Sequence, residues 1–519
     1  MQIIKKERKM DVLFISPGNS AATYQGLSQK YAAIEPPTWS LLLANSCRSV
    51  GYTVAILDVN AEKLSCEDVA ERVNNLNPRL ICFVVYGQNV NAGTTSMSGA
   101  TFLSQRLKEL GIKTPISYVG SHVQALPKKA LEDEPSIDFV FTNEAVYALR
   151  NVLSMPEIDA SSMENVKGIA WRRGENVVIN KSERVVPQER MDIDLPGYAW
   201  DLLPFDKKPL DLYRAPLWHA EYDEEQRSPY AALQTSLGCL FKCSFCMINI
   251  INRNDEAEIG VSANYNMMRY WSPEFIIKEF DKLVELGVHT IKITDEMFLL
   301  NKKYYEPLCE MIRDRGYGKF LRMWAYSRID TIRRPEVLKL VKDAGIRWLA
   351  LGIESGDKSV RLEVSKGRFE DVDIEKVIAQ VHEAGIEVMA NYIFGLPGDT
   401  LESMEKTLQL SKELCTLGWN AYPAMALPGS PLYKSGLDND YELPPTYEGF
   451  SFHSYKIVPL RNKALTGAQI VKFRDEAFIE YHSYPPFLQK VKEKVGQRGV
   501  DNVKKMLEVK LRRKILEGE

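Results

Sequence analysis

The stretch SLGCLFKCSFCMIN, residues 236–249, places Cys239, Cys243 and Cys246 in a C-x3-C-x2-C pattern. Thiolates are the soft ligands that iron–sulfur clusters require. Three cysteines this close together can bind three irons of one 4Fe–4S cubane and leave the fourth iron open to a small molecule. A structural zinc site is the alternative, but it needs a fourth Cys or His, and none follows within about 40 residues. The spacing therefore favours a cluster with one open iron.

A regular alternation of strands and helices surrounds these cysteines, from about residue 230 to 428. The strand-like runs are AALQTSL, HTIKITD, FLRMWAYS, RWLALGIES, IEVMANYIFG and NAYPAMALP. Five helical runs separate them, and each is followed by a glycine, the usual helix stop signal. These glycines are Gly287, Gly316, Gly345, Gly385 and Gly418. Six strand–helix units predict a partial TIM-type (β/α)6 barrel with its site at the carboxyl ends of the strands.

The N-terminal part shows a second alternation. MDVLFISPG, TVAILDVNA, RLICFVVYG, TPISYVGSH and IDFVFTNE are apolar runs typical of buried parallel strands, and helical segments separate them. Five strands in this arrangement predict a doubly wound, Rossmann-like α/β sheet, with ligands at the carboxyl ends of its strands.

Four regions follow from these patterns. We expect a Rossmann-like domain over residues 1–155, a linker containing a β-hairpin over 156–229, the barrel over 230–430 and a mostly helical region over 431–519. The hairpin is indicated by two alternating runs that Gly174 separates.

The composition is that of an ordinary globular protein, with 45% hydrophobic and 26% charged residues in 519. A chain of this length usually forms two or three domains. The net charge of −3 gives no overall attraction to nucleic acid. No apolar stretch approaches the roughly 20 residues of a membrane span, and no apolar signal core follows the basic N-terminus, so we expect a cytoplasmic protein.

The cysteine run and the barrel motifs, in their order, resemble the radical S-adenosylmethionine superfamily. The matching motifs are the aromatic Phe245 before the third cysteine, TDEMF at 294–298, WAYSRID at 324–330, GIESGD at 352–357 and YIFGLPGDT at 392–400. In that family the open iron binds the amino and carboxylate groups of S-adenosylmethionine, and an electron from the cluster yields a 5′-deoxyadenosyl radical. Each motif alone is weak, whereas five in order at one edge of a barrel are specific.

The resemblance implies contacts to the methionine part of S-adenosylmethionine. Thr294, Asp295 and Glu296 follow the second strand, where the family places polar contacts to the amino group. Arg328 follows the third strand and is the candidate contact to the carboxylate.

The resemblance also implies contacts to the nucleoside part. Glu354 and Ser355 would lie near the ribose, and Ile393, Gly395 and Pro397 beside the adenine. The Lys366-Gly367 pair fits a further short element of the family.

The N-terminal sheet resembles the cobalamin-binding domain that precedes the barrel in a large subgroup of this superfamily. The matching stretches are residues 36–62 and 118–145. The corrin-contact candidates are Gly87, Asn91, Gly120, Ser121 and His122. Cobalamin mutases carry a cobalt-ligating histidine after the first strand, whereas the loop at 16–37 has none. A Rossmann-like sheet that has lost this cofactor is the alternative.

The resemblance implies three cofactors, a 4Fe–4S cluster, S-adenosylmethionine and cobalamin. The function that it favours is methylation of an unactivated carbon. The deoxyadenosyl radical would abstract a hydrogen atom from that carbon, and methylcobalamin would supply the methyl group. A radical cyclase or ring-rearrangement enzyme with the same cofactors is the second hypothesis, and a non-catalytic cobalamin sensor is the third. An open cluster argues against the sensor.

The implied partners are a small-molecule substrate and an external electron donor such as flavodoxin or ferredoxin. No RNA-binding module is visible, so nucleic acid is not expected as a partner. The sequence gives no oligomeric state.

Overall fold

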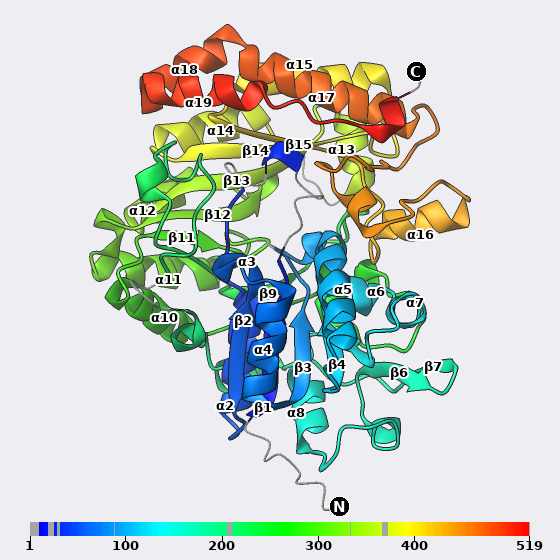
Figure 1. Cartoon of the computed structure of the whole chain (residues 1–519). Coiled ribbons are helices and arrows are strands. Elements are labelled where there is room, and N and C mark those ends of the chain that lie inside the picture. The colour runs from blue at the N-terminus through cyan, green and yellow to red at the C-terminus, as the bar shows by residue number, and fades with distance from the viewer. Residues whose placement is uncertain are drawn as a thin grey trace, which may run out of the picture. The chain divides into compact units, whose positions relative to one another are not determined.

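The structure is a computed structural model of the chain and describes residues 10–18, 25–27, 32–87, 89–204, 210–332, 334–365 and 372–517. Internal contacts divide the chain into two units, and Figure 1 labels most of their helices and strands. The first contains Met1–Ser20, Pro37–Phe205 and Met247–Arg269. The second contains Ala21–Pro36, Asp206–Cys246 and Tyr270–Glu519. The ranges 1–155, 156–229, 230–430 and 431–519 drawn from the sequence do not coincide with these units.

The first unit is built on a seven-stranded sheet of order β2-β1-β3-β4-β5-β6-β7. Its strands are β1 (Met10–Ser16), β2 (Val54–Asp58), β3 (Pro78–Val84), β4 (Ile116–Val119), β5 (Phe139–Phe141), β6 (Ile169–Arg173) and β7 (Asn176–Ile179). The first five are parallel, as predicted for a doubly wound sheet. β6 and β7 form the predicted hairpin, but β6 pairs antiparallel with β5 and so extends this sheet.

Helices connect these strands. They are α2 (Thr38–Arg48), α3 (Val59–Glu62), α4 (Cys66–Leu76), α5 (Gly93–Glu109), α6 (Ser121–Ala125), α7 (Pro127–Asp133) and α8 (Val146–Ser154). Helix α2 packs on α8, and α4 packs on α5. Right-handed crossovers in this strand order place these two pairs on opposite faces of the sheet. At the start of α4, Ser65 and Asp68 form a capping box.

The second unit contains a curled six-stranded sheet of order β15-β14-β13-β12-β11-β8. Its strands are β8 (Tyr230–Leu233), β11 (Thr290–Ile293), β12 (Arg322–Arg328), β13 (Ile346–Glu354), β14 (Glu387–Phe394) and β15 (Gly418–Pro423). Every neighbouring pair is parallel. The predicted (β/α)6 partial barrel is therefore confirmed.

The barrel helices are α10 (Pro273–Glu285), α11 (Lys302–Asp314), α12 (Pro335–Asp343), α13 (Lys358–Val364), α14 (Ile374–Glu383) and α15 (Leu401–Leu414). The glycines after α10, α11, α12 and α14 have positive φ angles, as predicted for helix stops. The prediction for Gly418 is wrong, because Cys415 takes the left-handed conformation after α15 with φ 43°. Gly418 instead begins β15, where a Cβ atom would meet Met389.

The predicted first barrel strand is two strands. β8 ends at Leu233, and the short β9 (Ser236–Cys239) pairs with β10 (Met267–Tyr270) in a separate two-stranded sheet. Cys239 is thus the last residue of β9 and does not directly follow a barrel strand.

The C-terminal region contains α16 (Pro431–Asp438), α17 (Gly467–Ser483), α18 (Pro485–Val495) and α19 (Gln497–Leu507). Its packing on the barrel includes a stacked pair, Trp419 of β15 and Tyr481 of α17, with ring centroids 5.2 Å apart. Among the described residues, no helix has the length and apolar character needed to cross a membrane.

Candidate functional site

The three cysteines lie in one loop of the second unit. Cys239 is buried, and Cys243 and Cys246 are half-buried. The backbone amide of Phe241 donates to Cys239 Sγ at 3.4 Å, and that of Cys246 donates to the Cys243 carbonyl at 3.2 Å. Gly238 supports the approach to this loop with φ 83°, a conformation that favours glycine. Local hydrogen bonds therefore order the turns that carry these cysteines, and their role as cluster ligands stays a prediction.

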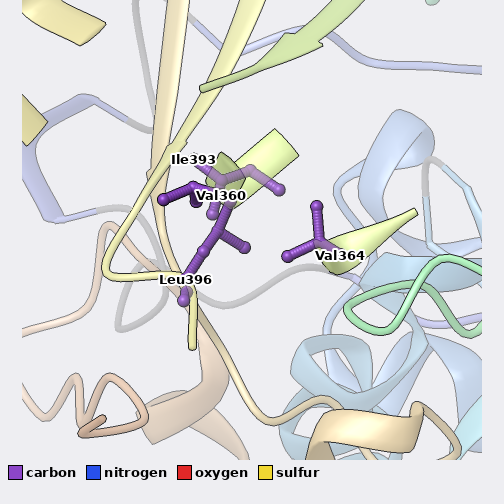
Figure 2. Close-up of a cluster of buried hydrophobic side chains, with 5 residues drawn as sticks. Val360, Val364, Ile393 and Leu396 are labelled. Atoms are coloured by element: carbon purple, nitrogen blue, oxygen red, sulfur yellow. The ribbon is translucent and has the colours of Figure 1, made fainter. Parts of the chain in front are cut away.

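Phe245 joins this loop to the barrel through apolar contacts. It packs against a buried cluster formed by Val360, Val364, Ile393, Leu396 and Ala424, four of which Figure 2 labels. Phe245 and Ile393 were both predicted as S-adenosylmethionine contacts. The structure brings them together in one apolar wall beside the cysteine loop.

Arg328, the last residue of β12, lies against the same loop. Its guanidinium carbon is 3.7 Å from the centroid of the Phe241 ring, and Nη1 lies 3.9 Å from Cys243 Sγ. Nε and Nη2 each donate to one oxygen of Asp330 at 2.5 Å. Asp330 and Phe241 were not predicted as site residues. The position of Asp330, two residues after Arg328, was the available signal.

Burial controls the chemistry of the thiols. It raises the pKa of Cys239 to about 12 and that of Cys243 to about 11, and the positive charge of Arg328 opposes the rise at both. The raised pKa favours the protonated form of Cys239 and Cys243, and a metal that binds them must displace these protons. No three His, Cys, Asp or Glu side chains in the described ranges are arranged to hold a metal ion. Thiolates of a cubane bind different irons, and this donor set fits three of its corners.

The other predicted contacts gather at one edge of the barrel sheet. Thr294 follows β11, Arg328 and Glu354 end β12 and β13, and Gly395 follows β14. Because these strands are parallel neighbours, their carboxyl ends lie at the same edge. Motifs that follow one another in the sequence therefore lie at the same edge of the barrel sheet.

Thr294 and Asp295 are engaged with the segment that leads to the cysteines. The Thr294 hydroxyl donates to the Leu233 carbonyl at 3.1 Å. Asp295 accepts hydrogen bonds from the amide and hydroxyl of Thr235, both at 2.6 Å, and from the Ser236 hydroxyl at 2.5 Å. Asp295 is 2% exposed, and burial raises its pKa despite these bonds. Both carboxylate oxygens are therefore occupied.

Glu296 and Glu354 differ from Asp295. Burial raises the pKa of each to about 7, with Lys292 opposing the rise at Glu296 and Arg328 opposing it at Glu354. Glu354 also has φ 67°, an uncommon conformation for a residue other than glycine. Strained backbone is often retained at functional sites. These two carboxyl groups can change protonation near neutral pH.

Ser355, predicted near the ribose, is fully buried. Its hydroxyl lies 3.2 Å from the Thr407 hydroxyl and accepts from the Asp357 amide at 3.1 Å. Its carbonyl accepts from Arg361 at 2.7 Å. The Ser355 side chain therefore has structural partners that the motif did not reveal. The Lys366-Gly367 pair lies outside the described residues.

The turn after β14 contains Gly395 and the half-buried Pro397. Asp399 accepts from the amides of Gly395 at 3.0 Å and Leu396 at 2.9 Å. Asn462 donates to the Leu396 carbonyl at 2.8 Å. Sequence reasoning missed Asp399 and Asn462, although Asp399 lies within the quoted motif. Both fix the turn in which the predicted adenine contacts lie.

The corrin-contact candidates lie at the carboxyl edge of the first unit's sheet. Gly87 follows β3 with φ 66°, and Gly120 precedes α6. A Cβ on Gly120 would meet the Val85 carbonyl at 2.2 Å, so only glycine permits this approach. The Ser121 hydroxyl donates to the Val90 carbonyl at 2.5 Å. This hydrogen bond joins the loops after β3 and β4, at the edge of the sheet where the corrin contacts are predicted.

His122 and Asn91 have specific partners in the first unit. His122 Nδ1 lies 3.2 Å from the Thr94 hydroxyl, and burial lowers the pKa of His122 to about 4. Asn91 Oδ1 accepts from the Met247 amide at 3.2 Å. His122 is thus a neutral, buried side chain in α6, and Asn91 contacts the residue after Cys246.

A cavity of about 500 Å³ lies in the second unit away from these residues. Its lining includes Thr290, Arg322 and Arg347, which stand at the amino ends of β11, β12 and β13. Parallel barrels carry their sites at the carboxyl ends of strands. The chemistry of the cysteine loop, and not cavity volume, therefore identifies the candidate site.

Comparisons with known proteins give two family matches in this chain. Residues 24–153 match the family model of the B12 binding domain, and residues 233–411 match that of the radical SAM superfamily. An uncharacterized methyltransferase of Pyrococcus horikoshii is 25% identical over 490 residues, which cover 93% of this chain and 94% of the relative. The anaerobic magnesium-protoporphyrin IX monomethyl ester cyclase of Cereibacter sphaeroides is 24% identical over 478 residues, covering 89% and 68%.

A solved structure shares the fold. It is that of the radical S-adenosylmethionine methyltransferase TsrM from Kitasatospora setae, with cobalamin and a [4Fe-4S] cluster bound. The TM-score is 0.61 at 16% identity, and the match covers 83% of this chain and 78% of the other.

Proposed function

We propose that this chain, in which a B12-binding domain precedes a radical SAM domain, is a cobalamin-dependent radical S-adenosylmethionine enzyme that methylates an unactivated carbon of a small molecule. The observation that carries the proposal is the cysteine loop. Three thiol groups lie in one segment, with the Arg328 cation beside Cys243 at the carboxyl edge of the barrel. Three ligands leave one iron of a cubane open, which a purely structural site does not require.

The residues of this chain have separate tasks in this proposal. Cys239, Cys243 and Cys246 would hold the cluster, and Phe245 would exclude water from one side of it through its apolar contacts. Arg328 and the half-buried carboxyl of Glu296 would orient the methionine part of S-adenosylmethionine, and the half-buried Glu354 would lie near the ribose. Asp295 would act through Thr235 and Ser236 on the segment before Cys239.

The nucleoside and corrin contacts are proposed from position. Ile393, Gly395 and Pro397 would border the adenine, in a turn that Asp399 fixes. Gly87, Gly120, Ser121 and the loop of Asn91 would border the corrin at the edge of the first sheet. The bound cofactors would supply a 5′-deoxyadenosyl radical for hydrogen abstraction and a methyl group for transfer, and the protein would supply position and a dry site.

A radical cyclase is the second candidate, and one observation favours it. The relative from Cereibacter sphaeroides is named as a cyclase and matches 89% of this chain. The relative from Pyrococcus horikoshii is named as a methyltransferase and matches 93% of it. We place methylation first because the structural neighbour TsrM is a methyltransferase with the same fold.

The partners that this chemistry needs are a small-molecule substrate and an external low-potential electron donor, such as flavodoxin or ferredoxin. A cytoplasmic location, where such donors occur, belongs to the same proposal.

Product analysis separates the two candidates. The protein would be reconstituted anaerobically with iron, sulfide and hydroxocobalamin, reduced, and incubated with S-adenosylmethionine carrying a deuterated methyl group and a soluble extract of its host. Methylation predicts S-adenosylhomocysteine together with 5′-deoxyadenosine, and a product heavier by the labelled methyl group. A cyclase predicts 5′-deoxyadenosine and a new product without the label. Formation of neither nucleoside by protein with both cofactors bound would reject both candidates.

A further inference from the structure

The segment after the cysteine loop belongs to the other unit of the protein. The second unit includes Cys246, and the first unit includes Met247–Arg269, here named the connecting segment. The connecting segment begins with Met247, Ile250 and Ile251, whose side chains are all buried. The chain therefore passes directly from the last cysteine of the loop to buried residues that are assigned to the first unit.

Buried charge anchors the far end of the connecting segment. Arg269 donates to Glu144 at 2.7 Å, and both side chains are 1% exposed. Arg269 also donates to the Val186 carbonyl at 2.8 Å. The Glu144 amide donates to the Ile251 carbonyl at 3.1 Å. Glu144 therefore binds the connecting segment twice, through its side chain and through its backbone. Separating such a pair would leave an uncompensated buried charge, which is costly. The intact pair therefore holds the connecting segment in this position.

A second set of bonds ties the connecting segment to α6. Arg253, which is almost fully buried, donates to the Gln124 carbonyl. The Gly260 amide donates to the Ala125 carbonyl at 2.8 Å. Helix α6 begins at Ser121, one of the corrin-contact candidates. The loop after β4 is thus linked through α6 to the connecting segment.

Asn91 provides the link closest to the cluster. The amide of Met247 belongs to the same peptide unit as the Cys246 carbonyl, and it donates to Asn91 Oδ1 at 3.2 Å. Because the donor is a backbone N–H, it identifies the side-chain oxygen of Asn91 as the acceptor. Asn91 lies in the 3-10 turn Val90–Ala92, whose first carbonyl accepts from Ser121 at 2.5 Å. One side chain in the loop after β3 therefore orients the peptide that follows a cluster ligand.

We propose that Asn91 is a positioning residue for the cluster, which makes cobalamin binding and cluster binding mutually stabilising. The inference rests on the proposed function. Order in the loops after β3 and β4 fixes the Cys246–Met247 peptide through Asn91, and this orients Cys246 toward its iron. Linkage then requires the reverse effect, in which a bound cluster favours the loop conformation that receives cobalamin. Asn91 acts here through Met247 and Cys246, whereas the family resemblance made it a candidate corrin contact.

The test measures cluster loss and not activity. Wild-type protein carrying the cluster would be exposed to a chelator with and without bound hydroxocobalamin, and the decay of cluster absorbance would be followed. We expect cobalamin to slow the decay about fivefold or more, the usual range of coupling between sites. Equal rates would overturn the inference, and this arm needs no variant. Failure of the wild type to bind the cluster or cobalamin would instead reject the proposed function.

Two substitutions assign the effect to Asn91. Asn91→Leu removes the acceptor at similar volume, and Asn91→Asp keeps an acceptor oxygen. We expect Asn91→Leu to lose the cluster at the cobalamin-free rate even with cobalamin bound, and to change the EPR spectrum of the reduced cluster. Asn91→Asp should restore both properties. Phe102→Ala, on an exposed residue of α5, is the control. Weaker cobalamin binding by Asn91→Leu with an unchanged cluster would make Asn91 a corrin contact only and overturn the inference.

Discussion

The carboxylate of Asp295 accepts hydrogen bonds from the backbone amide and the hydroxyl of Thr235, each at 2.6 Å. Asp295 follows β11, and Thr235 lies between β8 and β9, on the way to Cys239. The end of a barrel strand is thereby fastened to the segment that delivers the first cluster ligand. This contact relates the stability of the barrel to the geometry of the cysteine loop.

Removing the Asp295 carboxylate should lower the stability of the barrel and the amount of cluster that the protein binds. Three hydrogen bonds to a buried charged group would be lost, so Asp295→Ala should lower the free energy of unfolding by about 3 kcal/mol or more. Thr235→Val removes one of them and should cost about 1 to 2 kcal/mol. Urea unfolding of the apoprotein measures both changes, and iron analysis after reconstitution measures the cluster. An Asp295→Ala variant of wild-type stability would refute this role.

Arg328 should be needed both for the stability of the fold and for binding of S-adenosylmethionine. Asp330 is 2% exposed and accepts from two nitrogens of Arg328, so Arg328→Met should destabilise the fold by about 3 to 5 kcal/mol. Adding Asp330→Leu removes this buried carboxylate and should recover most of the stability. Neither variant should bind S-adenosylmethionine as the wild type does, which equilibrium dialysis with the cluster-loaded protein would measure. Undiminished binding by the double variant would exclude Arg328 as a contact.

Gly120 should tolerate no side chain. A Cβ atom there would meet the Val85 carbonyl at 2.2 Å, so Gly120→Ala must displace the loop after β4 from the loop after β3. We expect cobalamin binding, followed by absorbance after gel filtration, to fall at least tenfold. The control Gly174→Ala lies in the β6–β7 turn, where a Cβ would meet nothing within 4 Å. It should bind cobalamin normally, and equal binding by both variants would contradict the assignment of this edge.

Acid should destabilise the first unit through His122. Burial lowers the pKa of His122 from 6.5 to about 4, so the folded state favours the neutral ring. The resulting contribution is present above pH 6.5 and is lost as the pH falls toward 4. A difference of this size corresponds to about 3 kcal/mol. The gap in unfolding free energy between the wild type and His122→Asn should therefore shrink from pH 7 to pH 4.5. A gap that stays constant would disprove the effect, and His289→Asn, at an exposed position, is the control.

The sequence predicted the elements and missed many of their partners. The six barrel strands were predicted from runs of apolar residues, and four helix ends from the glycines that follow them. Both signals lie in neighbouring residues of the sequence. Cys415 could not be recognised as a left-handed helix end, because residues other than glycine adopt that conformation uncommonly and cysteine gives no signal for it. The motifs located Asp295 and Ser355 but did not reveal that their oxygens have partners within the protein.

Contacts between residues far apart in the sequence could not be predicted from it. Arg269 and Glu144 are 125 positions apart, and nothing in either local sequence indicates the other. The β6–β7 hairpin was recognised from its turn, but its pairing with β5 depends on an unsatisfied sheet edge far along the chain. Division of the chain into units therefore required the structure.

In the proposed function, Cys239, Cys243 and Cys246 hold a cluster that cleaves S-adenosylmethionine reductively. The most direct measurement is the yield of 5′-deoxyadenosine from cluster-loaded protein under dithionite, determined by mass spectrometry. We expect 5′-deoxyadenosine from the wild type and from Cys66→Ser, which alters a cysteine of α4 outside the loop. We expect none above background from Cys243→Ala. Absence of 5′-deoxyadenosine from wild-type protein with a confirmed cluster, or an undiminished yield from Cys243→Ala, would refute this role of the cysteines.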